Sequence, residues 1–319
     1  MPKLRQSEKK VFKTASGKNY RDAEDLNKEK IKSFFENKGY KVTNIKQPWR
    51  HFVAILEKDG QKHFLKMASG PGIAERTKNE VQFNKEVFKL VQKNKIDYFN
   101  VPEIITEGYY QKYYYFICQY YDSDLTATKN PPDPKNLQQW LSQVVKINRF
   151  LDSLPNLDLP WDQKENEVVE EYSKKHQIFY NEVKDPSLKP ILELANQIKN
   201  CYQPALNHGD FVPWHLIQNG EQLILIDSEA ASNLKPKYYD IAYFYRAVYT
   251  TLGPTLANKY LSLYLKTLSE KEKQILKPLF KSLLAIRILG GRYDLILENK
   301  KVSPSYHQIQ EELLAGKII

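Results

Sequence analysis

The 319-residue sequence contains only two cysteines, Cys118 and Cys201. Two cysteines cannot form a disulfide framework, and these two match no metal-binding spacing, so a reducing cytosol is the simplest expected compartment. The sequence also lacks a long apolar run, so no transmembrane helix is predicted. Its basic N-terminus has no apolar segment of the kind that a secretory signal requires. The protein is therefore expected to be cytoplasmic and to have no membrane partner.

Arginine is scarce, although the chain is strongly basic. Lysine and arginine together number 48 against 38 acidic residues, which gives a net charge of +10, but only eight of the 48 are arginines. Nucleic-acid-binding proteins usually carry clustered arginines or stacking aromatic residues on one face. Here the lysines are spread along the whole chain among glutamates. The charge therefore indicates a solvated surface; attraction of anions such as nucleotides is the lesser alternative, and a nucleic-acid partner is not expected.

The pattern of apolar residues predicts a mixed first part of the chain. Residues 1–20 are polar and charged, which predicts a flexible basic arm. Asp59-Gly60 lies between two strand-like runs and is a strong hairpin signal. The helical periodicity over residues 21–121 predicts a helix at 22–37 and a longer one at 72–94. Strand patterns predict three strands between these helices, at 40–45, 51–57 and 62–68, and two after them, at 103–110 and 113–121.

Prolines mark a change of pattern after this part. Pro131, Pro132 and Pro134 follow the last predicted strand, and the chain beyond them reads as mostly helical. The sequence therefore predicts an α+β protein with two lobes. The first lobe, residues 21–121, would consist of a small antiparallel sheet with one main helix; the second, residues 122–319, would be larger and mostly helical.

The stretch LNHGDFVPWHLI, residues 206–217, carries the first candidate site residues. Asp210 follows a glycine on a predicted tight turn. A strand then leads to the turn at Asn219-Gly220, and LILID returns, so a hairpin is expected to bring His215 and Asp227 to the same end of neighbouring strands. With Glu229, these groups would form a divalent-cation site with one spare carboxylate, which could orient or deprotonate an attacking hydroxyl.

The combination of HGD, IDSE and YDIA at this spacing resembles the aminoglycoside phosphotransferase and choline kinase-like family. The predicted order of strands and helices in the first lobe is also similar to that family. The resemblance covers nearly the whole chain beyond the N-terminal arm. It implies the bilobal protein kinase-like fold, with a nucleotide-binding first lobe and a second lobe that holds the catalytic loop and the acceptor site.

The resemblance assigns roles within the catalytic loop. Asp210 would be the catalytic base that positions the acceptor hydroxyl, and His208 would brace the loop. Asp227 would hold a magnesium ion that bridges the nucleotide phosphates. His215 stands where the family usually has asparagine, a second metal ligand. Imidazole suits manganese better than magnesium, so His215 could ligate or tune a metal, with manganese as the alternative to magnesium. The other reading is that His215 marks a site that has lost its activity.

The resemblance also assigns the nucleotide-binding residues of the first lobe. Lys66 would grip the α- and β-phosphates of ATP, with Glu80 as its ion-pair partner and Glu86 as the fallback. The segment from Gln119 to Tyr121 would be the hinge that binds adenine through its backbone. One departure from the family concerns the turn over the phosphates, KQPWRHF at 46–52, which contains no glycine. Without glycine, successive backbone N–H groups cannot come close to phosphates. The Arg50 side chain could bind the phosphates in their place.

Three further readings complete the sequence-based picture. Asp240 is expected to be the N-cap of the helix that follows it. The acidic run Asp162, Glu165, Glu167, Glu170 and Glu171 is read as a solvated helix face, with recognition of a cationic acceptor as the alternative. We therefore predict an ATP-dependent kinase that phosphorylates a hydroxyl of a small molecule. The alternative is a pseudokinase that binds nucleotide or a partner without phosphoryl transfer; the acceptor and the oligomeric state are left open.

Overall fold

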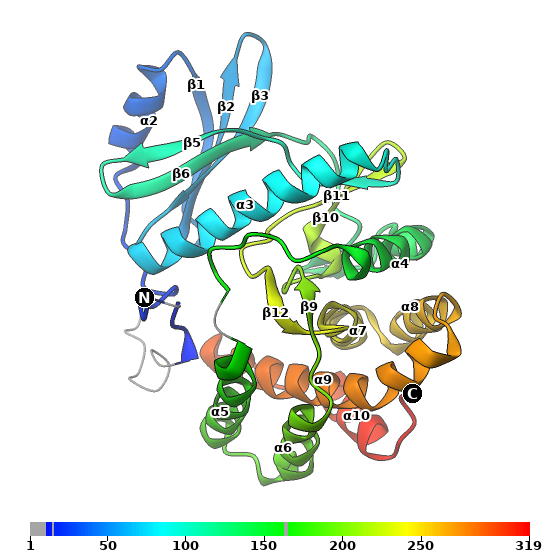
Figure 1. Ribbon diagram of the computed structural model, residues 1–319. Coiled ribbons are helices and arrows are strands. Elements are labelled where there is room, and N and C mark those ends of the chain that lie inside the picture. Colours follow the sequence, from blue (N-terminus) through cyan, green and yellow to red (C-terminus); the bar gives the residue numbers. More distant parts are fainter. Residues whose placement is uncertain (1–10, 15, 163–164) are drawn as a thin grey trace. The chain divides into compact units, whose positions relative to one another are not determined.

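The computed structural model describes residues 11–14, 16–162 and 165–319, and it divides the chain into two compact units (Figure 1). Unit 1 consists of Met1–Asp124, Leu157–Asp162 and Ile217–Ala231. Unit 2 consists of Leu125–Asn156, Gln163–Leu216 and Ser232–Ile319. Two later segments, Leu157–Asp162 and Ile217–Ala231, thus return to unit 1, and the second of them carries Asp227.

A five-stranded antiparallel sheet forms the centre of unit 1 (Figure 1). Its strands lie in the order β1-β2-β3-β6-β5, with bounds β1 Lys41–Lys46, β2 His51–Lys58, β3 Gln61–Ala68, β5 Ile104–Tyr110 and β6 Tyr113–Gln119. The β2–β3 turn is the predicted Asp59-Gly60 pair, and both residues have positive φ, 53° and 75°, as a two-residue hairpin turn requires.

Alternate residues of β6 face two different helices across this sheet. Tyr115 and Ile117 belong to a core cluster with Phe35 of α2 Lys28–Glu36. Tyr114, Phe116 and Cys118 lie in a second cluster with Val81 of α3 Pro71–Lys93. Because side chains alternate along a strand, this one strand fixes which helix covers which face of the sheet. Helix α2 begins later than predicted because the Asn27 side chain caps it by accepting from the N–H of Lys30.

The described part of the predicted N-terminal arm packs against the start of α3. Val11 and Phe12 are buried, and Lys18 lies 3.1 Å from Glu75 of this helix. The chain approaches so closely that a Cβ on Gly72 would lie 2.3 Å from the carbonyl oxygen of Asn19. Glycine is therefore required at position 72 for this contact. Residues 1–10 of the predicted arm lie outside the described residues.

The segment that returns to unit 1 belongs to a second sheet. The strands of this sheet lie in the order β10-β11-β4, with bounds β4 Phe99–Asn100, β10 Leu216–Asn219 and β11 Gln222–Leu225, and β4 was not predicted. Strand β11 runs parallel to β4, which anchors it beside the C-terminal end of α3. The chain leaves β11 through Ile226 and reaches Asp227, which has a positive φ of 64°. Aspartate tolerates this left-handed conformation better than most residues.

Unit 2 is mostly helical and is built around α9 Glu270–Leu297, most of whose second half is buried. Its other helices are α4 Leu137–Ser153, α5 Glu165–Val183, α6 Lys189–Asn196, α7 Tyr239–Leu252, α8 Pro254–Lys266 and α10 Pro304–Leu314. Helices α5, α6, α7 and α10 all contact α9. Strands β9 Pro204–Asn207 and β12 Ser232–Pro236 form an antiparallel pair; β9 ends just before the HGD residues, and β12 ends shortly before α7. A second antiparallel pair, β7 Thr128–Lys129 and β8 Pro132–Asp133, lies before α4.

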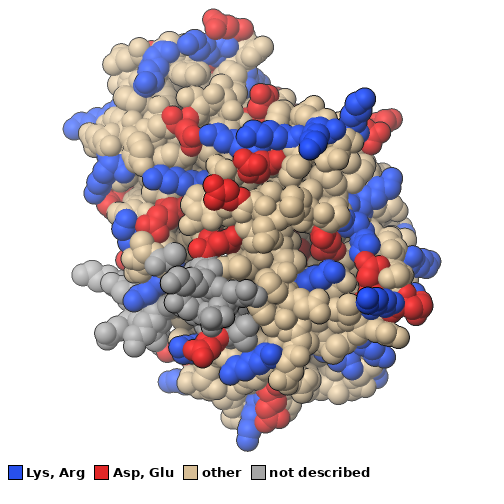
Figure 2. Space-filling view, viewed as in Figure 1, with Lys and Arg blue, Asp and Glu red and all other residues tan. Residues whose placement is uncertain are grey.

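These elements confirm the predicted α+β class, with an antiparallel sheet in the N-terminal part and helices in the C-terminal part. None of the helices in the described ranges combines the length and the apolarity that crossing a membrane requires. Figure 2 shows basic side chains distributed over the visible face, with acidic side chains among them.

Candidate active site

Lys66 of β3 is held between two carboxylates inside unit 1. Its Nζ donates to Oε2 of Glu80 at 2.6 Å and to Oδ1 of Asp227, also at 2.6 Å. Lys66 and Glu80 are buried, whereas about a third of the Asp227 side chain is exposed. Strand β3, helix α3 and the segment after β11 each supply one member. The three residues are far apart in sequence, and only the tertiary structure brings them together.

The charges of this triad depend on each other. Burial disfavours the ammonium form of Lys66, but the carboxylates of Asp227, Glu80 and Glu229 outweigh burial and raise its pKa above the usual value. Burial raises the pKa of the Glu80 carboxyl, although Lys66 opposes this shift. Lys66 is therefore a permanent cation at neutral pH, and Asp227 is the carboxylate of the triad that solvent reaches.

Glu86 does not pair with Lys66. Its carboxylate accepts from Gln82 at 3.3 Å and lies 3.5 Å from Lys89, both on the same helix. Glu80 and Glu86 are six residues apart on α3, so they face different directions on a helix with 3.6 residues per turn. The fallback assignment of Glu86 was therefore wrong.

A second cluster of charges surrounds Glu229, two residues after Asp227. The buried Glu229 carboxylate accepts from Nη2 of Arg50 and lies 3.7 Å from Nη2 of Arg76. His51 Nε2 lies 3.5 Å from its other oxygen. Burial, with help from Lys66 and Arg50, lowers the pKa of His51 well below its usual value, so His51 is neutral at pH 7. Glu229, which the sequence grouped with the expected cation site, is thus the anchor for Arg50.

The turn between β1 and β2 is tied down by side chains rather than by glycine. Gln47 donates to the carbonyl of Glu24 at 2.8 Å and accepts from the N–H of Leu26 at 3.0 Å. The carbonyl of Arg50 accepts from the Ser69 hydroxyl at 2.7 Å. The Arg50 guanidinium also lies over the ring of Trp49, at 4.5 Å. The structure therefore places the Arg50 side chain beside the Lys66 triad, through their shared neighbour Glu229.

The predicted hinge residues lie at the end of β6. The backbone N–H of Gln119 donates to the carbonyl of Glu103 at 3.1 Å, so it is already used within the sheet. The side-chain oxygen of Gln119 accepts from the Tyr121 hydroxyl at 2.9 Å. Gln119 is exposed and Tyr121 is partly exposed. Any adenine contact in this segment would therefore use backbone groups other than the Gln119 N–H.

The HGD loop of unit 2 is held from behind by Asp240. One carboxylate oxygen of Asp240 accepts from the backbone N–H of His208 at 2.6 Å, and the other accepts from Gly209 at 2.8 Å. The Asp240 N–H in turn donates to the side-chain oxygen of Asn207 at 3.2 Å. Gly209 has a φ of 82°, in the left-handed region that favours glycine. The loop is therefore fixed just before Asp210, whose side chain is partly exposed.

This placement corrects the expectation for Asp240. The N-cap of α7 is Tyr238, and Asp240 lies in the first turn of the helix. Its carboxylate does not cap its own helix but binds the backbone of the HGD loop, which lies in a distant segment of the chain. The positive φ of Tyr238, 65°, turns the chain so that α7 begins at Tyr239. Sequence spacing alone gives no signal for such a contact, because it spans more than 30 residues.

The two loop histidines have different environments. His208 is buried, and its Nδ1 accepts from the N–H of Asp210 at 3.3 Å. His215 ends a short 3₁₀ turn, Pro213–His215, where a strand was expected. Its Nδ1 lies 2.9 Å from the carbonyl oxygen of Asp210. Because a carbonyl can only accept, Nδ1 carries the proton, and in the neutral ring Nε2 holds the lone pair that a metal ligand needs.

The donor set of unit 1 fits a hard divalent cation. In unit 1, carboxylate oxygens of Glu80, Asp227 and Glu229 lie within 4.8 Å of one another. Glu80 and Glu229 are buried and paired with cations, so Asp227 is the member of this set that is best placed to hold a metal. Magnesium is usually held by one or two carboxylates together with substrate phosphates. The relation of Asp227 to Asp210 and His215, which belong to unit 2, stays a prediction.

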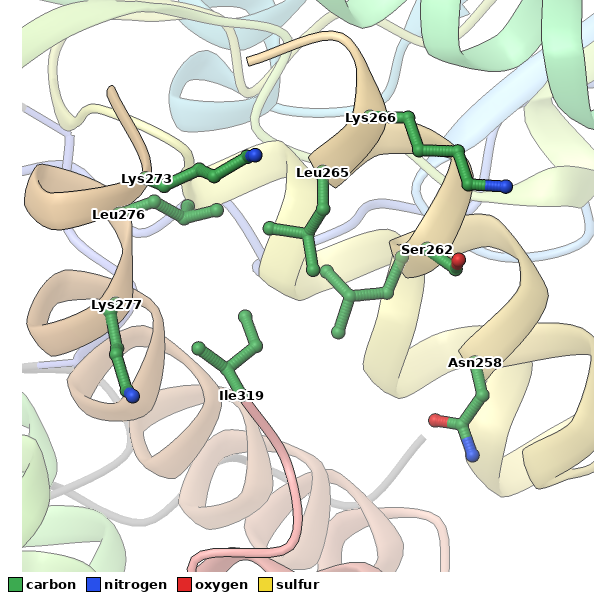
Figure 3. Close-up of a pocket in the computed structure, with 9 residues that line it drawn as sticks. Asn258, Ser262, Leu265, Lys266, Lys273, Leu276, Lys277 and Ile319 are labelled. Carbon is green, nitrogen blue, oxygen red and sulfur yellow. The ribbon is translucent and has the colours of Figure 1, made fainter. Parts of the chain in front are cut away.

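A groove elsewhere on unit 2 contains none of these residues. It has a volume of about 530 Å³ and lies between α8, α9 and the C-terminal Ile319, as Figure 3 shows. Its walls combine leucines with Lys266, Lys273 and Lys277. Since no acid, imidazole or hydroxyl of the candidate site reaches it, this groove has no part in the chemistry proposed below.

Comparison with known proteins bears on the family and the fold. A family model described as the phosphotransferase enzyme family matches residues 42–275. No curated protein matches the sequence closely enough to be called a relative. Several solved structures are similar in fold. A thermostable mutant of aminoglycoside phosphotransferase APH(4)-Ia, with ADP and hygromycin B, has a TM-score of 0.60 at 10% identity, over 90% of this chain and 96% of that one.

Two further structures extend the comparison. Choline kinase LicA from Streptococcus pneumoniae has a TM-score of 0.57 at 16% identity, over 91% of this chain and 99% of that one. Amicoumacin kinase hAmiN, in complex with AMP-PNP, Ca²⁺ and Ami, has a TM-score of 0.57 at 11% identity, over 89% and 95%. At such identities these likenesses establish the kinase-like fold alone, while the family model covers most of the sequence. The chain therefore belongs to the phosphotransferase enzyme family.

Proposed function

We propose that the protein is an ATP-dependent kinase that transfers a phosphoryl group to a hydroxyl of a small molecule. The observation that carries the proposal is the Lys66 triad, in which a buried cation and a partly exposed carboxylate lie 2.6 Å apart. A cation beside a metal-binding carboxylate is what the phosphates of a nucleotide require. Membership of the phosphotransferase enzyme family supports the same conclusion.

Each unit contributes its own part to the proposed reaction. In unit 1, Lys66 binds the α- and β-phosphates, Glu80 orients Lys66, Asp227 holds the metal, and the backbone between Gln119 and Tyr121 binds adenine. A bound magnesium ion, or manganese, supplies charge neutralisation at the phosphates. Because Lys66 already occupies one oxygen of Asp227, we expect the metal and the nucleotide to bind together rather than separately.

Asp210 of unit 2 is the proposed catalytic base. It accepts the proton of the acceptor hydroxyl as the hydroxyl oxygen forms its bond to the γ-phosphorus. The bond from that phosphorus to the β–γ bridging oxygen breaks, and its electron pair leaves with ADP. His208 acts as a positioning residue, since it is buried and binds the Asp210 N–H. His215 would ligate a metal through Nε2. The two free cysteines fit the expected cytosolic location.

A nucleotide-binding pseudokinase is the second candidate. The β1–β2 turn favours it, because this turn contains no glycine and its Arg50 is already paired with Glu229. The two candidates differ in one step only, the transfer of the phosphoryl group. They agree on nucleotide binding in unit 1.

One experiment separates these functions. Thermal stabilisation by ATP with Mg²⁺ or Mn²⁺ is measured for the wild type, Asp227→Ala and Asp210→Asn, alongside phosphoryl transfer to a panel of small alcohols. The kinase proposal expects metal-dependent stabilisation that Asp227→Ala loses and Asp210→Asn keeps, and transfer that both variants lose. Stabilisation without transfer to any alcohol would support the pseudokinase. If ATP and metal leave the wild type unchanged, both candidates are wrong.

A further inference from the structure

A row of polar side chains lies on one face of α7, beside the catalytic loop of unit 2. Tyr239, Tyr243 and Arg246 are spaced by four and three residues, so they share a face of this helix. Tyr239 directly precedes Asp240, whose carboxylate holds the backbone of His208 and Gly209. The row therefore begins next to the residues that position Asp210.

Arg287 of α9 packs against this row. Its Nη1 donates to the hydroxyl of Tyr239 at 2.9 Å, and its guanidinium carbon lies 3.8 Å from the centre of the Tyr243 ring. The guanidinium of Arg246 lies 5.3 Å from the same ring. Two positive charges thus converge on Tyr243, in contacts that favour cations over an aromatic face.

Neither of these arginines forms an ion pair with a carboxylate among the described residues, although Asp294 and Asp210 lie near enough to act electrostatically on Arg287. Arg246 Nη1 donates to the hydroxyl of Tyr306 at 3.2 Å, but the Nε atoms of Arg246 and Arg287 are buried without a hydrogen-bond acceptor among the described residues. By contrast, Arg149 and Arg292 of the same unit lie 2.8 Å and 2.5 Å from carboxylates of Glu272 and Asp185. A mostly buried guanidinium that is not directly paired with a carboxylate is unfavourable, and a bound anion would relieve this cost.

The pair is also within electrostatic reach of the proposed catalytic base. Burial and the negative charge of Asp210 raise the pKa of Tyr243 well above its usual value, and burial mainly raises that of Tyr239. Both tyrosines therefore stay neutral at pH 7. Tyr243, Arg246 and Arg287 are partly exposed, so solvent reaches them. A small molecule that contacts them would lie close to Asp210.

We propose that Arg246 and Arg287, arranged around Tyr243, bind an anionic group of the acceptor, so that the substrate is a hydroxyl compound carrying a carboxylate or a phosphate. The planar fork of N–H donors on an arginine matches both groups. This inference rests on the proposed function, because it names the acceptor class for the same site. It is opposed to the cationic acceptor that the acidic run 162–171 suggested.

Little of that acidic run bears on the choice. The side chains of Glu165, Glu167 and Glu171 lie outside the described residues, and Glu170 lies 3.7 Å from Lys174. Asp162 belongs to unit 1. Beside this loop the structure places Arg246 and Arg287, together with Lys235, whose Nζ lies 5.7 Å from the centre of the Tyr239 ring. The one carboxylate bound to the loop backbone, that of Asp240, is already used by the N–H groups of His208 and Gly209 among the described residues.

The test uses acceptors that differ in charge on one scaffold. Glucose, glucosamine, glucuronate and glucose 6-phosphate form one set; glycerol, 2-amino-1,3-propanediol, glycerate and glycerol 3-phosphate form another. ATP-dependent phosphorylation is measured for the wild type, Arg287→Gln, Arg287→Lys and Arg246→Gln. Arg149→Gln serves as a control, since Arg149 has a carboxylate partner and is outside the proposed site. Thermal melting of each variant reports folding.

The expected result is a preference for an anionic member of at least one set, by tenfold or more in kcat/KM over its neutral and amino counterparts. The carboxylate and phosphate members show which anion is bound. Arg287→Gln should reduce this preference by about tenfold to a hundredfold, mainly through the KM of the acceptor, with the KM for ATP unchanged. Arg287→Lys should lie between the two, and Arg149→Gln should match the wild type. Preference for neutral or amino acceptors, or a preference that survives both Arg287→Gln and Arg246→Gln, would overturn the inference.

A binding measurement distinguishes failure of this inference from failure of the proposed function. Thermal stabilisation by glucuronate, glycerate and inorganic phosphate is measured without nucleotide, in the wild type and Arg287→Gln. Transfer to neutral acceptors without anion binding would leave the kinase standing and the anion site refuted. Arg287-dependent stabilisation by an anion, in a protein that neither binds nor uses ATP, would support the anion site and refute the kinase. If nothing is phosphorylated and no anion stabilises the wild type through Arg287, the inference is wrong.

Discussion

Replacement of Glu80 tests whether the Lys66 triad is held as the structure indicates. Glu80 is buried, and its Oε2 accepts from Lys66 Nζ at 2.6 Å. In Glu80→Gln the side chain keeps an acceptor oxygen but loses its charge. A hydrogen bond to a charged group contributes about 1.5–3 kcal/mol, against about 0.5–1.5 kcal/mol for a neutral one, so the free energy of unfolding should fall by about 1 kcal/mol.

Glu80→Ala should cost more because it removes the acceptor. Breaking a buried pair costs about 3–5 kcal/mol when the remaining charge has no other partner. Lys66 keeps Asp227, at 2.6 Å, so we expect a smaller loss, of about 2–3 kcal/mol. The freed Lys66 should also turn fully to Asp227 and compete there with the metal. The dissociation constant for ATP with Mg²⁺ should therefore rise at least tenfold.

Urea unfolding at pH 7, followed by tryptophan fluorescence, measures the first effect, and nucleotide titration measures the second. Glu86→Gln and Glu86→Ala provide matched controls on the same helix, since Glu86 is partly exposed and its carboxylate contacts Gln82 and Lys89 of its own helix. Both controls should change stability by less than about 0.5 kcal/mol. The reasoning is refuted if Glu80→Ala is no less stable than Glu86→Ala, or if it binds ATP as tightly as the wild type.

Three further predictions follow from other parts of the two units. Burial lowers the pKa of His176 to about 3, so between pH 6.5 and pH 3 the unfolded chain takes up a proton at this residue and the folded chain does not. The free energy of unfolding should therefore fall by about 2 kcal/mol between pH 7 and pH 5, and urea unfolding of His176→Gln should show a smaller decrease over the same range. In Asp240→Asn, one of the two loop N–H groups that Asp240 now binds would face an amide NH₂ instead of a carboxylate oxygen. This loss should lower kcat at least tenfold and reduce the free energy of unfolding by about 1–3 kcal/mol, and an unchanged kcat would contradict the bracing role of Asp240. Arg50→Gln removes the closest partner of the buried Glu229 carboxylate and should lower the free energy of unfolding in urea by about 2 kcal/mol. Lys46→Gln, at an exposed position at the end of β1, serves as the control and should leave stability unchanged.

Much of the fold could be predicted from sequence periodicity. Alternation along β6 and the helical spacing of α3 are local signals, and Asp59-Gly60 sets the register of its hairpin through turn geometry alone. The strands β4, β9 and β12 could not be predicted, because each is only two to five residues long and is defined by its partner rather than by its own pattern. The start of α2 depended on the side chain of Asn27 as a cap, which shifted the helix beyond its apolar pattern.

Short local motifs were enough to identify the residue types of the candidate site. Lys66, Asp210 and Asp227 each lie in a short motif whose neighbours are close in the chain, so motif spacing was enough to single them out. The tertiary structure decided which charges are paired: it chose Glu80 over Glu86, placed Arg50 on Glu229, and turned Asp240 from an expected helix cap into the brace of the HGD loop. Among the described residues, it also left Arg246 and Arg287 without a carboxylate at ion-pair distance. The physical reason is that charge pairing depends on distances of a few ångströms between segments far apart in sequence, and no local pattern encodes them.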